Sequence, residues 1–179
     1  MKRREFLMQT AVGGLVMAAP MAMAQPSASA PDANQKFSLT GFDDTSSRII
    51  RLENFLGKVC LISFFTSGCN LCNHDLKLMR EFYVSNRKKD FVLIGVNMDE
   101  SKADFEDYKR LVALSVPKEQ NFPILWRKGP EYVDNFGIIK TKPTHFVLDK
   151  TQKLMFRREG TFGPDDWNLV WDKIGKELN

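Results

Sequence analysis

Two cysteines separated by two residues, Cys69 and Cys72, stand where an apolar strand gives way to an amphipathic helix. Residues 59–65 form a nearly continuous apolar run, which is typical of a strand covered on both faces. A cysteine at the start of the following helix faces unpaired backbone N–H groups and the positive end of the helix dipole, which favour the thiolate. Cys69 is therefore the predicted attacking sulfur. Cys72, about one turn further on, can resolve a mixed disulfide.

Structural uses of this cysteine pair are disfavoured. A structural zinc normally takes four ligands, whereas the chain offers only one further cysteine and two histidines. A disulfide that closes so short a loop restricts the unfolded chain little. The third cysteine, Cys60, lies in the middle of the apolar run and is predicted to be a buried thiol without a chemical role. We predict no metal and no cofactor beyond the redox-active Cys69–Cys72 disulfide itself.

The first 24 residues have the features of an export signal. Lys2-Arg3-Arg4 is a basic start, residues 11–19 are apolar, and residues 22–24 fit a small-x-small cleavage pattern. The paired arginines resemble a twin-arginine signal, with an ordinary secretory signal as the alternative. The apolar stretch is too short to cross a bilayer comfortably. We predict a periplasmic protein, membrane-tethered if the signal is uncleaved.

Length and charge predict one domain. Residues 25–36 are rich in Pro, Ser and Ala and read as a flexible leader, so residues 37–179 form the predicted domain. The whole chain carries a net charge of +4, and the signal holds three basic residues and one acidic one, which leaves +2. That is too little to indicate nucleic-acid binding. We expect a monomer.

The order of the predicted elements indicates an α/β fold. Residues 59–65 and 91–96 are apolar strands joined by a helix, a βαβ unit that places Cys69 at the carboxyl edge of the sheet. The other predictions are a short strand at 48–52, a helix at 101–115, an edge strand at 122–126, a short helix at 131–136 ended by Gly137, a hairpin of 145–148 with 153–157, and a last helix opening at 163–166.

This pattern resembles the exported TlpA/ResA-type branch of the thioredoxin family. The resemblance extends over essentially all of the mature chain, and its matching features are residues 52–58 with Gly57-Lys58, the cysteine pair, residues 91–99, residues 136–138 and Lys142-Pro143-Thr144. It implies a thioredoxin fold, a central mixed sheet with flanking helices and a C-terminal β-hairpin plus helix. It also implies that Pro143 is cis and lies beside the cysteines, with the backbone at Lys142 free to pair with an extended substrate. Lys142, Pro143 and Thr144 are thus the predicted substrate-binding residues.

Near the cysteines, this chain departs from the usual family pattern at three positions and matches it at a fourth. Gly68 replaces the tryptophan that family members usually have before the first cysteine, and Asn70-Leu71 replaces the usual Gly-Pro, so the reduction potential is not transferable. Many relatives carry an acid three residues after the second cysteine, where this chain has Asp75. Asp75 is a candidate proton shuttle for Cys72 if it is desolvated. The alternative is a solvated helix acid beside His74.

The favoured function is an exported thiol-disulfide oxidoreductase that reduces disulfides of exported partner proteins and is regenerated by a membrane or periplasmic thiol reductant. A copper-binding metallochaperone is an alternative, since two thiolates with His145 or His74 suit Cu(I), although copper-binding relatives of this fold have three residues between their cysteines. His145 itself is expected to pack or to point out from its strand. A peroxiredoxin-like peroxidase is a third hypothesis, because Thr66 precedes Cys69 by three residues.

Overall fold

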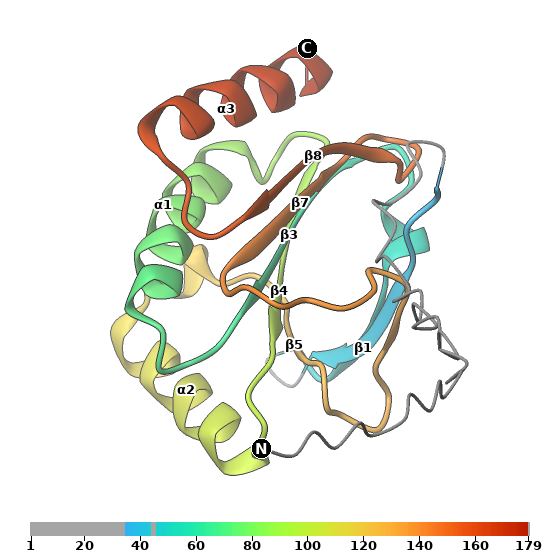
Figure 1. Ribbon diagram of the computed structural model, residues 1–179. Coiled ribbons are helices and arrows are strands. Elements are labelled where there is room, and N and C mark those ends of the chain that lie inside the picture. The colour runs from blue at the N-terminus through green and yellow to red at the C-terminus, as the bar shows by residue number, and fades with distance from the viewer. Residues whose placement is uncertain (1–34, 44–45, 179) are drawn as a thin grey trace, which may run out of the picture. The chain divides into compact units, whose positions relative to one another are not determined.

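The centre of the sheet is the predicted βαβ unit. Strand β3 (Val59–Phe65) and strand β4 (Phe91–Asn97) pair in parallel, and helix α1 (Asn70–Asn86) connects them (Figure 1). Every residue of β3 is buried, as its continuous apolar run predicted. The computed structural model describes residues 35–43 and 46–178. The predicted export signal and nearly all of the predicted leader lie outside the described residues.

The described residues form one eight-stranded mixed sheet in the order β2-β1-β5-β4-β3-β7-β8, with β6 paired to β1. The remaining strands are β1 (Leu39–Asp43), β2 (Arg48–Arg51), β5 (Ile124–Trp126), β6 (Val133–Asp134), β7 (Thr144–Leu148) and β8 (Leu154–Glu159). Strands β7 and β8 form the predicted antiparallel hairpin, and β7 also pairs antiparallel with β3. The edges of the sheet are therefore β2 and β8.

Two further helices follow the predicted positions. Helix α2 (Lys102–Ser115) begins after Ser101, whose hydroxyl accepts a hydrogen bond from the backbone N–H of Asp104, and helix α3 (Pro164–Leu178) opens with Pro164 and two acids. Short 3₁₀ turns lie at Leu52–Phe55 and Lys118–Gln120. None of the helices in the described ranges is long and apolar enough to span a membrane.

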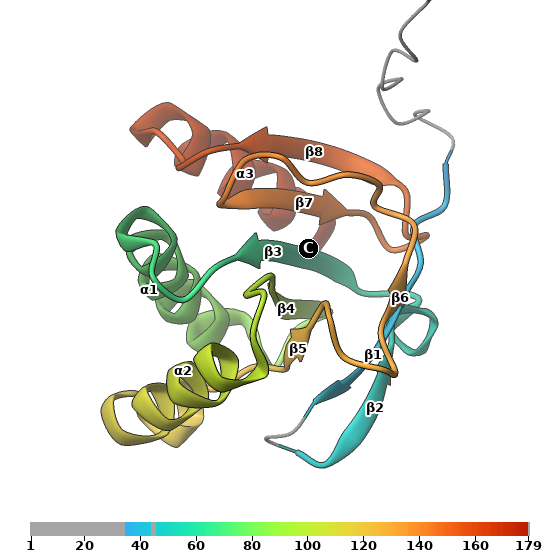
Figure 2. The same ribbon diagram turned by 60° about the horizontal axis from the view of Figure 1, so that its bottom comes forward.

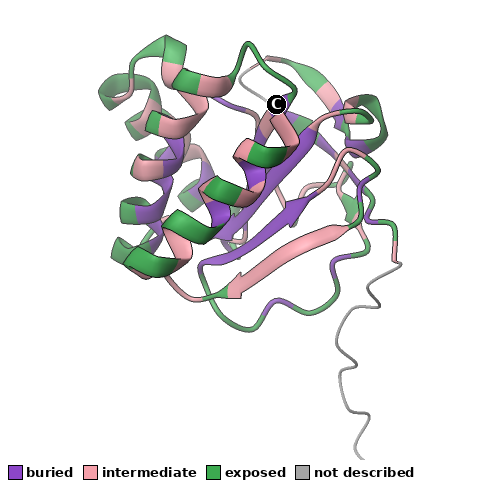
Figure 3. Ribbon diagram, turned by 90° about the horizontal axis from the view of Figure 1, so that it is seen from above, coloured by how far each residue is buried: buried purple, intermediate pink, exposed green. Residues whose placement is uncertain are grey.

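The sheet has two differently covered faces (Figure 2). One face packs against the three helices, in a core that includes Leu61, Phe65, Cys72, Leu76 and Val170. The opposite face carries an aromatic core made of residues from β3, β7 and the segments before β1 and β7, namely Phe37, Phe64, Phe136 and Phe146. Figure 3 shows that the central strands are buried, whereas β8 is half-buried along its length.

Two local predictions were wrong, and one strand was not predicted. Residues 122–126 were predicted as an edge strand, but β5 lies inside the sheet because β1, which the sequence analysis missed, pairs with it. The predicted helix at 131–136 is absent, since Val133 and Asp134 instead pair with β1 as strand β6. Gly137 does have the predicted positive φ, 74°.

The last two residues of the predicted leader, Gln35 and Lys36, are hydrogen-bonded to Asn135. The side-chain amide of Gln35 donates to the carbonyl of Asn135, and Asn135 in turn donates to the carbonyl of Lys36. Gln35 and Lys36, which were predicted to belong to the flexible leader, thus hydrogen-bond to the folded domain.

Candidate active site

Cys69 and Cys72 form a disulfide, with their Cα atoms 5.2 Å apart. Cys69 is the N-cap of α1, and its Sγ accepts a hydrogen bond from the backbone N–H of Cys72 at 3.1 Å. This is the end of the helix where unpaired N–H groups stabilise a thiolate. Cys69 is half-buried, whereas Cys72 has no exposed surface. Of the two sulfur-bearing residues, Cys69 is therefore the one with surface that an external molecule can reach.

The loop before Cys69 is anchored to the end of β4. The backbone N–H of Ser67 donates to Oδ1 of Asp99 at 2.9 Å, and the Ser67 hydroxyl donates to Oδ2. The side chain of Asn97 donates to Oδ2 of Asp99 at 2.8 Å, and the Trp126 indole N–H donates to the Asp99 carbonyl. Sequence reasoning missed this anchor, although Asn and Asp directly after a buried strand were a usable signal.

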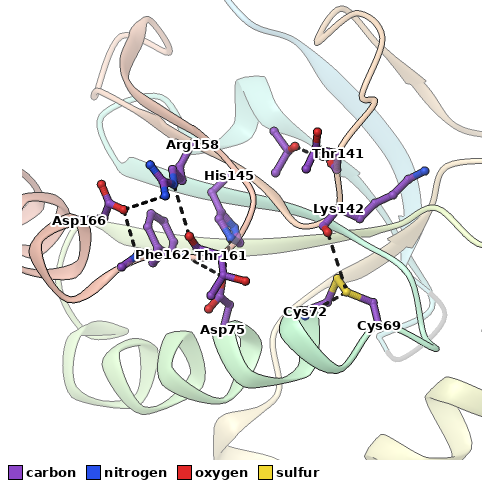
Figure 4. A network of polar contacts seen from close by, with 12 residues as sticks. Cys69, Cys72, Asp75, Thr141, Lys142, His145, Arg158, Thr161, Phe162 and Asp166 are labelled. Carbon is purple, nitrogen blue, oxygen red and sulfur yellow. Dashed lines mark hydrogen bonds and ion pairs between the residues drawn. A yellow bond between two sulfur atoms is a disulfide. The ribbon is translucent and has the colours of Figure 1, made fainter.

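The segment around Pro143 lies beside the cysteine pair. The Lys142–Pro143 peptide bond is cis, as the family resemblance implied. The carbonyl oxygen of Lys142 is 4.0 Å from Sγ of Cys69 (Figure 4). Lys142 is exposed, whereas the buried Thr144 donates its hydroxyl to the Thr141 carbonyl at 2.6 Å. Of the three predicted substrate-binding residues, Lys142 is thus the one with exposed surface next to Cys69.

Asp75 and His145 meet in the interior. Both side chains have no exposed surface, and Nε2 of His145 lies 3.0 Å from Oδ2 of Asp75. The backbone N–H of Phe162 also donates to Oδ2, at 3.2 Å (Figure 4). The interpretation of Asp75 as a solvated helix acid was therefore wrong, because α1 turns it inward with Cys72 and Leu76. His145 packs inside, and its ring stacks on Phe162 with centroids 4.3 Å apart.

Burial determines the charge of the imidazole. It lowers the pKa of His145, and the positive charge of Arg158 acts in the same direction, while the hydrogen bond and the charge of Asp75 oppose the shift without cancelling it. The neutral ring can donate its Nε2 proton to the carboxylate. Neither Oδ1 of Asp75 nor Nδ1 of His145 has a hydrogen-bond partner among the described residues.

The remaining thiol is on the aromatic face of the sheet. Cys60 is buried, and burial raises its pKa to about 12, so it is the inert core thiol that the sequence predicted. Within the part of the chain that the structure describes, no group of three or more His, Cys, Asp or Glu side chains could hold a metal ion.

The solved structures that resemble this chain define its fold class. A Chlorobium tepidum protein assigned as thiol:disulfide interchange protein DsbE superposes with a TM-score of 0.64 and 22% identity, covering 79% of this chain and 94% of that one. StoA from Bacillus subtilis superposes with a TM-score of 0.54 and 20% identity, covering 73% and 94%. The α/β architecture is that of thioredoxin-like proteins, as predicted.

Sequence comparison then gives the family. Residues 26–157 match the AhpC/TSA family, and the chain belongs to that family. Among individual relatives, ResA of Bacillus thuringiensis subsp. konkukian, named a thiol-disulfide oxidoreductase, is 26% identical over 117 residues, which are 65% of this chain and 64% of that protein. ResA of Geobacillus thermodenitrificans is 26% identical over 123 residues, 69% of this chain and 67% of that protein. The predicted TlpA/ResA-type likeness is confirmed.

Proposed function

We propose that the protein is an exported thiol-disulfide oxidoreductase that reduces disulfides in partner proteins. The observation that carries the proposal is the pairing of an accessible sulfur at a helix N-cap, Cys69, with a fully buried sulfur one turn along, Cys72. The relatives named thiol-disulfide oxidoreductase support the same activity, although the match spans only 64% of the first of them. Reduction is the favoured direction because the TlpA-like branch mostly reduces.

The reaction divides between the two sulfurs. In the reduced protein the Cys69 thiolate attacks the partner's disulfide, forming a mixed disulfide and releasing one partner thiolate, which takes a proton from water. Cys72 then loses its proton, attacks Sγ of Cys69 and expels the second partner sulfur. The protein is left as the Cys69–Cys72 disulfide and two electrons have passed to the partner. A thiol reductant in the membrane or periplasm returns the pair to the dithiol.

Asp75 is the proposed acceptor of the Cys72 proton. The two residues are three apart on α1, so they are neighbours on one helical face, and both are fully buried. Because Cys72 is buried, water cannot take up its proton. A buried carboxylate close to it is a suitable base for that step.

The partner is proposed to bind as an extended segment beside Lys142. A backbone carbonyl 4.0 Å from Cys69 can accept a hydrogen bond from a partner's N–H while the partner's disulfide lies against the sulfur. Such main-chain recognition fits many sequences. The partners are therefore proposed to be exported proteins that share an accessible disulfide.

A trapping experiment tests the exchange mechanism. In a Cys60→Ala background, Cys72→Ser should accumulate a mixed disulfide with a disulfide-bonded peptide, because the resolving sulfur is gone and Cys69 remains. Cys69→Ser in the same background is the matched control and should accumulate none. If the Cys72→Ser protein captures no peptide, the mechanism is wrong. The reduction potential of the Cys69–Cys72 pair, measured on residues 25–179, then shows whether the protein donates electrons to its partners or accepts electrons from them.

Two alternative functions would use the same thiols. The AhpC/TSA match and the spacing of Thr66 to Cys69 favour peroxide reduction as a second candidate. A single-turnover comparison separates the two, since a peroxidase would consume hydrogen peroxide faster than it reduces the peptide disulfide. Anaerobic titration with Cu(I) tests the copper-binding alternative, which requires stoichiometric binding that weakens in His145→Ala.

A further inference from the structure

The helix-covered face of the sheet contains a polar cluster that includes Asp75, three residues after Cys72 on α1. Ser63 of β3 and His145 of β7 are cross-strand partners, so their side chains share a face of the sheet, and Asp75 of α1 reaches the same place. All three are fully buried. We call Ser63, Asp75 and His145 the polar cluster.

Each member of the polar cluster has one buried polar atom without a partner in the described residues. These atoms are Oγ of Ser63, Oδ1 of Asp75 and Nδ1 of His145. Such atoms are costly in a protein interior, and a stable fold rarely keeps several together. Their neighbours in this core are apolar side chains such as Leu61, Phe65 and Leu76. The polar cluster is thus an exception within an otherwise apolar core.

The hydrogen bonds of Asp75 are distributed unequally between its oxygens. Oδ2 accepts a hydrogen bond from the backbone N–H of Phe162 at 3.2 Å and lies 3.0 Å from Nε2 of His145, which is its second donor when the neutral ring carries its proton on Nε2. Two donors on one oxygen suit an ionised carboxylate, which only accepts. Oδ1 is left open, so a proton can arrive there without breaking either bond.

We propose that His145 is a positioning residue that fixes the carboxyl group of Asp75 through Oδ2 and leaves Oδ1 open to accept the proton of Cys72 during resolution. The proposal rests on the oxidoreductase function and deepens it. When Cys72 attacks Sγ of Cys69, its proton passes to Oδ1, the Cys69–partner S–S bond breaks, and the departing sulfur carries away the electron pair. The imidazole keeps its own proton throughout, and its donation from Nε2 compensates the desolvation of the carboxylate.

The charged groups around His145 are consistent with this role. Asp75 approaches it from α1, and Arg158 faces it from the adjacent strand β8, where the two residues are cross-strand partners. Arg158 is 3.4 Å from Oδ2 of Asp166 on α3, which partly balances its charge. The partner on β3 is the uncharged Ser63. Among the residues that the structure describes, Asp75 is therefore the acceptor within hydrogen-bond distance of Nε2 of His145, at 3.0 Å.

A chromogenic aromatic disulfide tests the proposal, because reduced protein releases the coloured thiol in two phases. The first phase is the attack by Cys69 and the second is the resolution by Cys72. His145→Leu should leave the first phase unchanged and slow the second at least about tenfold at neutral pH, because the Asp75 carboxylate loses the side chain that fixes its orientation.

Two variants separate positioning from proton transfer by the ring. His145→Gln keeps an N–H donor but does not titrate, so it should restore the second phase to within about threefold of the wild-type rate. Asp75→Asn should slow the second phase at least as much as His145→Leu, and adding His145→Leu to it should cost nothing further. His74→Leu, at the exposed neighbour of Asp75, is the matched control and should change neither phase.

Three results would overturn the proposal. They are a second phase in folded His145→Leu as fast as in the wild type, a loss in His145→Gln as large as that in His145→Leu, and additive losses in the double variant. Circular dichroism shows which variants fold, and His145→Gln keeps the test informative if His145→Leu does not. Absence of the first phase in the wild type would instead contradict the oxidoreductase function itself.

Discussion

The two faces of the sheet use the same strands for different purposes. On β3 and β7, Phe64 and Phe146 point to the aromatic face, where four phenylalanine rings pack with centroids 4.7 to 5.8 Å apart. The adjacent residues, Ser63 and His145, point to the helix face and form the polar cluster with Asp75. Because successive side chains of a strand point to opposite faces, one residue packs in the aromatic core while its neighbour along the chain belongs to the polar cluster. The aromatic face can be optimised for packing while the other keeps partly unsatisfied polar groups.

The sharpest contrast between the faces is in their thiols. Cys69→Ala should abolish reduction of a peptide disulfide, because no other sulfur is accessible as a nucleophile among the described residues. Cys60→Ala, on the aromatic face, should leave the rate unchanged. Alkylation of the reduced wild-type protein at neutral pH should label Cys69 first. Equal labelling of Cys60 in the native protein would contradict the assignment.

Loss of one ring on the aromatic face should be a stability effect only. Phe146→Ala removes a fully buried ring that contacts three others, so the free energy of unfolding should fall by about 3 to 5 kcal/mol. Chemical denaturation measures this value. The rate of disulfide exchange, measured well below the unfolding transition, should stay within about twofold of wild type. A large loss of rate in the folded variant would show that the faces are coupled.

Replacing both members of the Asp75–His145 pair on the helix-covered face should not lower the free energy of unfolding, whereas replacing one of them should. Asp75→Leu alone leaves Nε2 of His145 buried without an acceptor, which should cost about 1 to 3 kcal/mol. The double variant Asp75→Leu/His145→Leu removes both partners and should be at least as stable as wild type, with a gain of up to about 4 kcal/mol. Denaturation curves of the three proteins give the comparison. If the double variant is less stable than the single one, the pair contributes to folding more than proposed.

The smallest expected effect is a pH dependence that originates in one histidine. The pKa of His145 is lowered by folding, so below its ordinary value of about 6.5 the unfolded chain takes up a proton that the folded protein does not. Stability should therefore fall as pH drops below about 6.5, by at most about 1.4 kcal/mol per pH unit from this group. His145→Gln should remove this component, whereas His74→Gln, at the exposed histidine, should keep it. An equal dependence of stability on pH in the two variants would contradict the lowered pKa of His145.

The elements that were predicted correctly are those with strong local sequence patterns. The continuous apolar run of β3, the cap at Ser101 and the proline and acids at the start of α3 each fix an element within a few residues. The position of Cys69 at a helix N-terminus followed from the same signals. The cis bond before Pro143 came from the family resemblance rather than from any residue pattern.

The features that were missed depend on contacts between distant parts of the chain. Strand β1 has five residues, and β6 has two and forms only by pairing with β1. The meeting of Asp75 with His145 joins residues seventy positions apart. A carboxylate on the inward stripe of α1 and a histidine in a buried strand were signals, but periodicity alone assigns them no partner.

The charges at the margins of the sheet have a consequence for solubility. Strands β2 and β8 are the edges, and they carry Arg48 and Arg51 on one side and Arg157, Arg158 and Glu159 on the other. Unpaired strand edges can join copies of a chain into aggregates, and repulsion between like charges opposes this. The arginines on β2 and β8 therefore disfavour pairing of one copy's sheet edge with the sheet edge of another copy.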